Sequence, residues 1–214
     1  KSVLSFGDDS FHAFANAHVS GLKLARSSGN VQNCIGVASD TATLVNCWIY
    51  DFVYTSGGTP GGSYSAGTVE DCLFTGCRNN GSSGNFNFSG IVKVHNCVFT
   101  GNYLGGAALD HYGIIYLSGN AAFENNVVYG NYAVAVTTAG KVSKSAGIYV
   151  SGGSPVIRNC VIRHNMKDGT LATGTEANWC IAASATPVVA NCNTPDAPDG
   201  ATGCQTANPS FVGA

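Results

Sequence analysis

Short runs in which apolar and polar residues alternate recur along most of this chain. The clearest unit spans residues 147–165, where Ile148 and Val150 precede a second run from Val156 to Ile162. A Gly-Gly-Ser-Pro corner separates the two runs, and the pair Asn159-Cys160 interrupts the second. Alternation with period two, bounded by Gly, Pro and Asn, predicts a strand, a turn and a strand.

Variants of this unit occur seven times, at Val19–Leu24, Leu44–Ile49, Val69–Phe74, Val94–Phe99, Phe123–Val128, Ile157–Ile162 and Val189–Thr194. The fourth positions are Leu22, Cys47, Cys72, Cys97, Asn126, Cys160 and Cys192, at intervals of 25, 25, 25, 29, 34 and 32 residues. A period of this size with variable loops is typical of a solenoid. The β-branched and aromatic content predicts that its coils are made of strands.

Asn or Asp stands at the third position of six units, namely Asn46, Asp71, Asn96, Asn125, Asn159 and Asn191. For the first and fourth positions both to face the interior, the chain must bend between them. Asn and Asp tolerate left-handed backbone and bond to neighbouring main chain, so we expect them at this bend, stacked as an amide ladder. A second ladder is expected five residues after the fourth position, at Asn102, Asn131 and Asn165, with Phe52 and Cys77 in earlier coils.

Each coil is expected to hold another strand, thirteen residues before the fourth position, where Gly113–Tyr116 aligns with Gly147–Val150. The connections that lengthen along the chain are 103–112, 132–146 and 166–178. We therefore expect one β-helix domain over residues 1–214. Its expected parts are an N-terminal cap or first partial coil (1–18), about seven coils (19–194) and a C-terminal cap or tail (195–214) that is truncated or processed.

Composition narrows the class of partner. Charged residues make up 10% of the chain and the formal net charge is −2, so a broad electrostatic footprint for nucleic acid or anionic lipid is absent. No apolar run reaches membrane-spanning length, and no signal peptide precedes the repeats. We expect a neutral partner, no membrane insertion, and a chain that begins after processing or is a piece of a larger protein.

Nine cysteines would ordinarily indicate disulfides and an extracellular setting. Four of them, Cys47, Cys72, Cys97 and Cys160, are interpreted as small residues that fill one interior column. Side chains stacked in neighbouring coils have Cβ atoms about 4.8 Å apart, which is longer than the roughly 3.8 Å between the Cβ atoms of a disulfide. Disulfides along this column are therefore not expected. Cysteines a whole coil apart also lack the short paired spacing of a metal site, so no metal is expected. Cys192 and Cys204 flank a loop after the last coil and are the candidate disulfide.

The pattern resembles the right-handed parallel β-helix repeat family of bacterial secreted and surface proteins, which includes pectate-lyase-like domains and polymorphic outer-membrane or autotransporter passengers. The resemblance rests on the Val-x-Asn-Cys-x-Phe-x-Gly-Asn run at Val94–Asn102 with its relatives, and on Gly-Ile-Tyr-Val-Ser-Gly-Gly from Gly147. It covers about Val19 to Thr194. It implies an all-β, single-stranded right-handed parallel β-helix outside the cell or on its surface. It implies no particular reaction, since the family spans lyases, hydrolases and non-catalytic adhesins.

Three sets of residues are candidates for function. The outward column Glu70, His95, Glu124 and Arg158 is either an acid/base strip or a solvated ladder of mixed charge. Trp48, Tyr50 and Tyr129 are either aromatic platforms for sugars or ordinary exposed strand residues. If the long connections lie side by side, they line a groove with Asp110, His111, Tyr112, Lys141, Lys144, Lys167, Asp168 and Glu176.

In that groove, Asp110 and His111 are a candidate acid/base pair, Lys141 or Lys144 a candidate cation for a substrate carboxylate, and Asp168 a further catalytic candidate. Tyr112 and Glu176, with Trp48 and Tyr129, are the candidate ligand-binding residues. The alternative is that all of these are ordinary polar loop residues. Pectate-lyase-like enzymes hold Ca²⁺ with several carboxylates on adjacent coils beside an Arg or Lys base, and here Asp and Glu do not cluster on successive strands.

The leading hypothesis is a non-catalytic, extracellular β-helix for adhesion or surface assembly, with no cofactor. Its expected partner is a glycan or a host or neighbouring-cell surface, with self-association through the coil ends or a lateral face. The alternative is a polysaccharide lyase or glycoside hydrolase with its site in the groove of the three long connections. An enzyme requires three or more convergent acidic or basic side chains there, whereas an adhesin is expected to show a flat face of Tyr, Asn and Thr.

Overall fold

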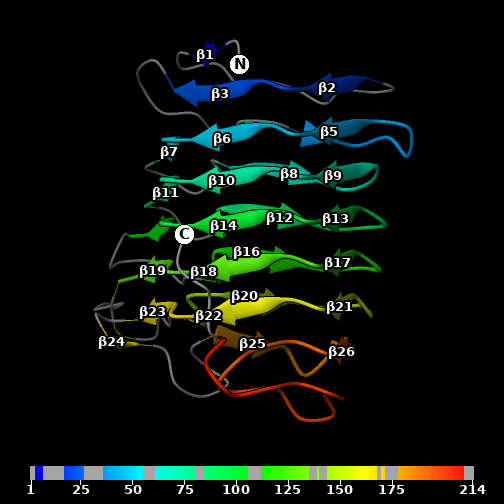
Figure 1. Ribbon diagram of the computed structural model, residues 1–214, viewed down its shortest axis with the longest axis vertical. Coiled ribbons are helices and arrows are strands. Elements are labelled where there is room, and N and C mark those ends of the chain that lie inside the picture. The colour runs from blue at the N-terminus through cyan, green and yellow to red at the C-terminus, as the bar shows by residue number, and fades with distance from the viewer. Residues whose placement is uncertain are drawn as a thin grey trace.

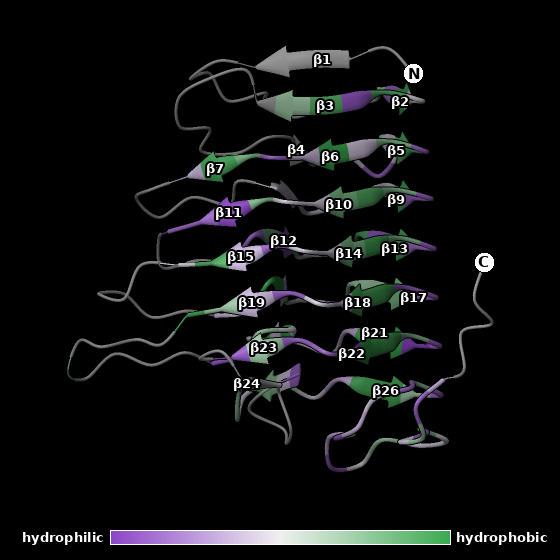
Figure 2. Ribbon diagram, turned by 60° about the vertical axis from the view of Figure 1, so that its left-hand side comes forward, coloured by the Kyte–Doolittle hydropathy of each residue, from purple (hydrophilic) through white to green (hydrophobic). Residues whose placement is uncertain are grey.

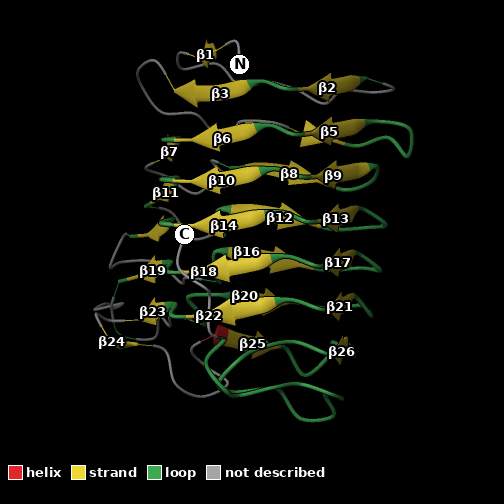
Figure 3. Ribbon diagram, in the orientation of Figure 1, coloured by secondary structure: helices red, strands yellow, loops and turns green. Residues whose placement is uncertain are grey.

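The computed structural model describes residues 3–6, 17–26, 36–54, 61–80, 84–105, 112–134, 139, 144–167, 170–171 and 178–209. Within these residues the chain winds into a stack of coils made of strands, with a single helical residue, Asn178, just ahead of β25 (Figures 1 and 3). Strands of successive coils pair side by side in four sheets, here called sheets I to IV. The pairing is parallel except between β23 and β24, which are antiparallel.

Sheets I and II each contain seven strands. Sheet I is β2 (His18–Ser20), β5 (Thr43–Val45), β9 (Thr68–Glu70), β13 (Lys93–His95), β17 (Ala122–Glu124), β21 (Val156–Arg158) and β26 (Val188–Ala190). Sheet II is β1 (Val3–Phe6), β3 (Lys23–Arg26), β6 (Trp48–Tyr50), β10 (Leu73–Thr75), β14 (Val98–Thr100), β18 (Val127–Tyr129) and β22 (Val161–Arg163). Each of the seven sequence units supplies one strand of sheet I.

Sheets III and IV each contain six strands. Sheet III is β7 (Val53–Tyr54), β11 (Arg78–Asn79), β15 (Tyr103–Leu104), β19 (Tyr132–Ala133), β23 (Met166–Lys167) and β24 (Thr170–Leu171). Sheet IV is β4 (Gly36–Val37), β8 (Gly62–Tyr64), β12 (Phe86–Phe88), β16 (Ile115–Leu117), β20 (Ile148–Val150) and β25 (Trp179–Ile181). Along the described chain a full coil runs through sheets I, II, III and IV in turn, whereas the described strands of the first coil, β2, β3 and β4, belong to sheets I, II and IV. The connections 103–112, 132–146 and 166–178 begin with the sheet III strands β15, β19 and β23 and lead to sheet IV.

The interior is filled by the positions that the repeat predicts to be apolar. Val94 and Phe99, at the first and sixth positions of one unit, are fully buried, as are their equivalents Phe123 and Val128 in the next coil. Phe74 and Phe99 stack with ring centroids 4.6 Å apart, so aromatic side chains also follow one another along the axis. Figure 2 shows hydrophobic residues concentrated in the strands of sheets I and II and hydrophilic residues at the corners. The predicted all-β solenoid is confirmed.

The corner between sheets I and II is the predicted left-handed bend. Asn46, Asp71, Asn96, Asn125, Asn159 and Asn191 all have φ between 52° and 57°. Their side chains are exposed, and Asn159 Nδ2 donates to Asn125 Oδ1 at 3.1 Å. Gly21 (φ 71°) and Gly203 (φ 63°) occupy the same corner at the two ends of the column. A residue without a Cβ meets the same backbone requirement, so the corner is continuous from the first unit to the last.

The second ladder is the buried one. Asn102, Asn131 and Asn165 are at most 1% exposed, and each side-chain amide donates to the next residue of the ladder. The series of hydrogen bonds continues beyond Asn165, because Asn165 Nδ2 donates to Asn178 Oδ1 and Asn178 Nδ2 donates to Asp196 Oδ1 at 2.9 Å. A left-handed residue precedes each of the first three, with Gly101, Gly130 and His164 at φ 63°, 64° and 53°. The predicted asparagine ladder is therefore confirmed, and it extends further than the sequence indicated.

The cysteine column is buried as predicted, but it is more than a filler. Each thiol donates to the carbonyl two residues earlier, as between Cys97 Sγ and His95 O at 3.1 Å. Asn126 continues the column, because its Oδ1 accepts from Cys97 N at 2.8 Å and its Nδ2 donates to Val94 O at 3.0 Å. A thiol or an amide at this position thus forms hydrogen bonds with main-chain groups of the preceding coil. Burial raises the pKa of the neighbouring interior thiol, Cys77, to about 12.

Cys192 and Cys204 are both free thiols, so the candidate disulfide is absent from the structure. The residues after β26 turn back to form parallel bridges from Ala190 to Thr202 and from Asn193 to Gln205. This arrangement puts Cys204 beside Cys192 as the next member of the cysteine column. Two side chains stacked in parallel point the same way, which is the physical reason that they are not bridged.

The alignment of sheet IV was wrong by one residue. Tyr116 pairs with Tyr149, not with Val150, and Ile115 pairs with Ile148. The turn from sheet IV to sheet I is residues 118–121 in one coil but 151–155 in the next, with Val156 opening the following strand. Counting a constant thirteen residues back from the fourth position therefore shifts the register, and a shift of one residue exchanges the two faces of a strand.

Residues that follow the last coil pack against it. Trp179 is fully buried and donates from Nε1 to Thr194 Oγ1 at 3.0 Å. Ala201 and Cys204 pack against the hydrophobic core. At the other end, β1 pairs with β3, so residues ahead of the first unit already contribute a strand to sheet II.

Candidate functional site

Most residues of the proposed long-loop groove lie outside the described residues. These are Asp110, His111, Lys141, Asp168 and Glu176. Tyr112, Lys144 and Lys167 are described and are half-buried. The acid/base pair and the groove itself therefore stay predictions.

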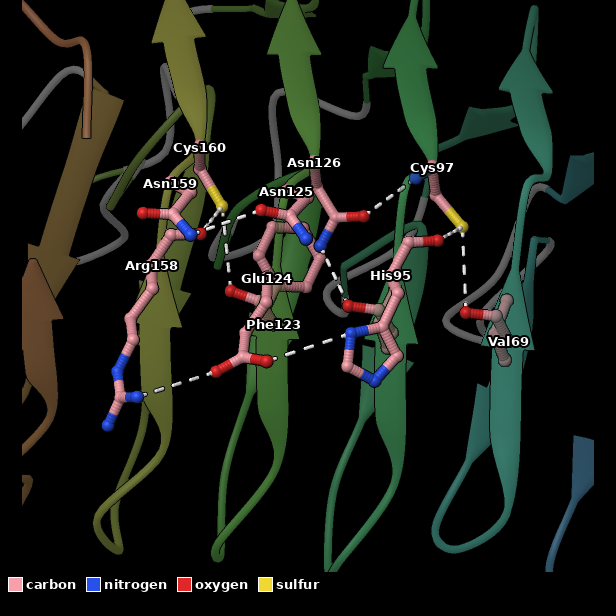
Figure 4. A network of polar contacts seen from close by, with 11 residues as sticks. Val69, His95, Cys97, Phe123, Glu124, Asn125, Asn126, Arg158, Asn159 and Cys160 are labelled. Atoms are coloured by element: carbon pink, nitrogen blue, oxygen red, sulfur yellow. Dashed lines mark hydrogen bonds and ion pairs between the residues drawn. The ribbon is translucent and has the colours of Figure 1, made fainter. Parts of the chain in front are cut away.

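The outward charged column forms a chain of contacts along sheet I. Glu124 lies between a histidine and an arginine, with His95 Nδ1 at 3.7 Å from one carboxylate oxygen and Arg158 Nη1 at 3.9 Å from the other (Figure 4). Registry of β9 with β13 puts Glu70 beside His95 on the same face. These side chains are 25–49% exposed, so solvent screens the pairs and each contributes little to stability. The arrangement fits the interpretation as a solvated ladder of mixed charge.

The aromatic candidates Trp48 and Tyr129 do not form one site. Both lie on the outer face of sheet II, 40% and 37% exposed, but on β6 and β18, which β10 and β14 separate. Lys23 Nζ lies 4.4 Å from the Trp48 ring, and the Tyr129 ring contacts His164 with centroids 4.9 Å apart. Tyr112 lies in a different part of the molecule, just ahead of strand β16 of sheet IV. The structure thus divides the predicted ligand-binding residues between two faces.

Three tyrosines gather on the outer face of sheet IV. Tyr116 and Tyr149 are the central residues of the paired strands β16 and β20, and their ring centroids lie 5.5 Å apart. Tyr112, just ahead of β16, completes the group at 5.4 Å from Tyr149 and 6.2 Å from Tyr116, with its plane at 90° to the latter. We call these three residues the tyrosine trio. All three are half-buried, so the rings support one another and hold fixed orientations while part of each surface stays open to solvent.

Burial and neighbouring groups disfavour ionisation of Tyr149. Partial desolvation raises the pKa of Tyr149 above its ordinary value, with further contributions from Cys180, Tyr116 and Tyr112. Cys180 is the next residue in the same outward column, paired with Tyr149 through β20 and β25. The Tyr149 phenol therefore stays neutral, and its hydroxyl can both donate and accept a hydrogen bond.

Sequence reasoning identified Tyr112 but missed Tyr116 and Tyr149 as its partners. The one-residue slip in the alignment of sheet IV placed Tyr116 opposite Val150, which concealed a column of aromatic residues. The signal was nevertheless present, because Tyr149 follows Gly147-Ile148 and Tyr116 follows Gly113-Ile114-Ile115, in runs that were recognised as equivalent strands.

A second aromatic column lies on the outer face of sheet III. Tyr103 and Tyr132 pair across β15 and β19 and stack with centroids 5.4 Å apart and an interplanar angle of 17°. Arg78 lies over the Tyr103 ring, with Cζ 4.2 Å from its centroid. Because these rings stack on each other and beneath a guanidinium, less of their face is free to receive a ligand.

Within the described part of the chain, no three His, Cys, Asp or Glu side chains are grouped to hold a metal ion. Nor does this part contain a helix long and apolar enough to cross a membrane.

Comparison with known families agrees with the geometry. A family model described as a right-handed β-helix region matches residues 12–186, which is most of the chain. This protein belongs to the right-handed β-helix family. Neither the curated proteins nor the solved structures contain a significant match to it.

Proposed function

We propose that this protein is a secreted or cell-surface β-helix that binds glycans through the tyrosine trio. The family supports a surface or carbohydrate-active β-helix in general terms, and the trio supports the finer assignment. Sugar rings present an apolar C–H face and a hydroxyl rim. Half-buried tyrosines present an apolar ring and a hydroxyl tip, which suits both parts of a sugar.

The observation that carries the proposal is that Tyr112, Tyr116 and Tyr149 contact one another while remaining partly exposed. Mutual packing limits the rotamers of each ring before any ligand arrives, so little conformational entropy is lost on binding. Two of the rings repeat from one coil to the next. The surface therefore suits an extended chain of sugars that runs along the helix axis.

Adhesion through a lateral face is a further part of the proposal. The outer face of sheet II carries Tyr50, Thr75, Thr100 and Tyr129 in one register, each alternating with a buried residue of the same strand. The exposed Asn bends lie at the other end of the same strands, two residues ahead of the first strand residue, as with Asn96 and Val98. Tyr, Thr and Asn on a flat surface are the features expected of an adhesin, and the extracellular location belongs to the same proposal.

The test is binding of the whole chain to a panel of neutral and acidic polysaccharides by affinity electrophoresis and calorimetry. Tyr149→Ala and Tyr116→Ala should each weaken binding by about fivefold to tenfold, the range expected for loss of one aromatic contact. Tyr132→Ala, a half-buried tyrosine that stacks on Tyr103 in sheet III, is the matched control and should bind as the parent does. Absence of binding to every polysaccharide, or equal affinity in the trio variants, would overturn the proposal.

The enzyme alternative is tested with the same panel by detecting new reducing ends and unsaturated products. Turnover that Asp110→Ala or His111→Ala abolishes would favour a lyase or hydrolase over an adhesin.

A further inference from the structure

The turn that follows β26 adds one more corner to the column of left-handed bends. Thr202 N donates to Val189 O at 3.0 Å, and residues 202–205 lie against the last coil through parallel bridges, as a further coil would. Gly203, with φ 63°, stands where the preceding coil has Asn191. The backbone of the column therefore continues for one corner beyond its last side-chain amide.

That last amide presents an acceptor to the glycine corner. Asn159 Nδ2 donates to Asn125 Oδ1 at 3.1 Å, so between these two coils a carbonyl oxygen faces the coil that follows it (Figure 4). Asn191 Oδ1 is oriented in the same sense, because a Cβ placed on Gly203 would lie only 2.4 Å from it. Asn191 therefore offers an acceptor at a position where the next corner supplies no side chain.

A surface cleft of about 430 Å³ opens at this corner. Its lining consists of Asn159, Asn191, Cys192, Asn193, Gly203 and Gln205. The volume falls within the range of small-molecule sites, about 300–1,000 Å³. Among the described residues that line the cleft, none carries a charge or an aromatic ring. The cleft therefore suits a neutral ligand that forms hydrogen bonds.

One wall of the cleft is held in place by a buried cation. Arg163 is 9% exposed, and its Nη1 donates to Asn193 Oδ1 at 2.7 Å. Asn193 Nδ2 donates to Ala207 O at 2.9 Å, so both ends of this amide are engaged. The same guanidinium nitrogen donates to Thr206 O and Ala207 O, which fixes the segment next to Gln205. The wall is therefore formed before a ligand arrives, and less entropy is lost on binding.

Two amides of the lining are available to a ligand. Within the described part of the chain, the side chains of Asn191 and Gln205 make no hydrogen bond, and both residues are exposed. Each amide offers one acceptor oxygen and two donor hydrogens. A planar amide group in the ligand, with its N–H and C=O on opposite sides, would take the place of the next Asn in the column.

We propose that this cleft binds the acetamido group of an N-acetylated amino sugar. The acetamido N–H donates to Asn191 Oδ1, its carbonyl oxygen accepts from Gln205 Nε2, and the sugar hydroxyls face the rest of the polar lining. A peptide also carries amides, but its apolar side chains would find no apolar wall among the lining residues. The cleft lies at the corner between sheets I and II, so it is separate from the tyrosine trio on sheet IV and does not depend on it.

The test is a titration of the isotopically labelled whole chain with N-acetylglucosamine, followed by NMR through the side-chain NH₂ signals of Asn and Gln. We expect saturable shifts of the Asn191 and Gln205 signals, with a dissociation constant on the order of 1 mM. Glucose, which lacks the acetamido group, should bind at least about fivefold more weakly, the loss expected for one hydrogen bond. Tyr149→Ala should leave these shifts unchanged, so this result is read separately from that of the polysaccharide panel.

Gly203→Asn is the most informative variant. Asn tolerates the left-handed corner, as at Asn191, and its own amide would continue the column into the cleft. It should fold and lose binding, whereas Asn96→Ala, at an equivalent corner of another coil, should bind as the parent does. Circular dichroism checks the fold of each variant. Gln205→Ala, at an exposed position, should weaken binding about fivefold and keeps the test valid if Gly203→Asn fails to fold.

Four results would overturn the proposal. They are parent-like binding by a folded Gly203→Asn or by Gln205→Ala, equal affinities for N-acetylglucosamine and glucose, absence of any shift at Asn191 and Gln205, and binding of N-acetylglycinamide as tight as that of the sugar. The last result would show that the cleft recognises a peptide-like amide and not a sugar.

Discussion

The side-chain amide of Asn131 donates to Oδ1 of Asn165 at 2.9 Å, from one coil to the next inside the core. Asn131 Nδ2 also donates to Phe99 O at 3.0 Å, and its Oδ1 accepts from both N and Nδ2 of Asn102 at 3.0 Å. Every polar atom of this buried side chain therefore has a partner. The ladder joins neighbouring coils by side chains in addition to the main-chain pairing of the sheets.

Asn131→Ala should destabilise the protein by about 2–4 kcal/mol, because it leaves buried polar groups of Asn102 and Phe99 without partners. Urea denaturation followed by circular dichroism measures the loss. The control is Asn120→Ala at an exposed turn, which should change stability by less than about 0.5 kcal/mol. A loss no larger than that of the control would show that the ladder does not stabilise the fold.

The cysteine column predicts an exchange of residue types. The Asn126 side chain accepts a hydrogen bond from Cys97 N and donates one to Val94 O, both in the preceding coil. The Cys72 thiol makes the equivalent pair of hydrogen bonds, with Cys47 N and Leu44 O, at 3.5 Å each. Asn126→Cys should therefore cost less than about 1.5 kcal/mol, since a weaker hydrogen bond is retained. Asn126→Leu, of similar size, should cost about 2–4 kcal/mol because both groups become unpaired. Equal stability of the two variants would refute this reading of the column.

Backbone conformation at the bends gives a third prediction. Asn96 has φ 54°, a conformation that costs a β-branched residue on the order of 1–2 kcal/mol. Asn96→Val should lose about that amount of unfolding free energy, whereas Asn96→Gly should be nearly neutral. Lys93→Val, an exposed position in the regular strand β13, separates the effect of the bend from that of adding an apolar surface residue. The three variants are compared by thermal and urea denaturation.

The end of the ladder predicts a dependence of stability on pH. Desolvation raises the pKa of Asp196, although hydrogen bonds from Asn178 and Thr194 oppose the shift. A carboxyl whose pKa is higher in the folded state favours folding when protonated. Its contribution is fully present below the unfolded value near 3.8 and is lost as pH rises through the folded pKa.

Asp196→Asn keeps an acceptor for Asn178 and cannot ionise. At pH 7 it should be more stable than the parent by less than about 1 kcal/mol, since the group is only partly buried, and the difference should disappear near pH 4. Thr194→Val removes one of the opposing hydrogen bonds and should move the parent's pH dependence upward. Identical pH profiles for the parent and Asp196→Asn would contradict the prediction.

Local pattern was sufficient to identify the repeat, the burial of its apolar positions and the left-handed bends. Each of these features depends on a few adjacent residues. Asn96, for example, must bend the chain if Val94 and Cys97 are both to face inward. Its role can therefore be predicted from the adjacent residues alone. The same holds for the ladder at Asn102, Asn131 and Asn165, whose spacing from the bend does not vary.

Features that join distant coils depended on three-dimensional packing. The turn between sheets IV and I changes length from coil to coil, so only the paired strands show that Tyr116 lies beside Tyr149 and that both contact Tyr112. Likewise, the chain after β26 has no repeat of its own, and its bridges to Ala190 and Asn193 bring Cys204 to the column. Register and chain return are global properties, because their free energy comes from contacts between residues far apart in sequence.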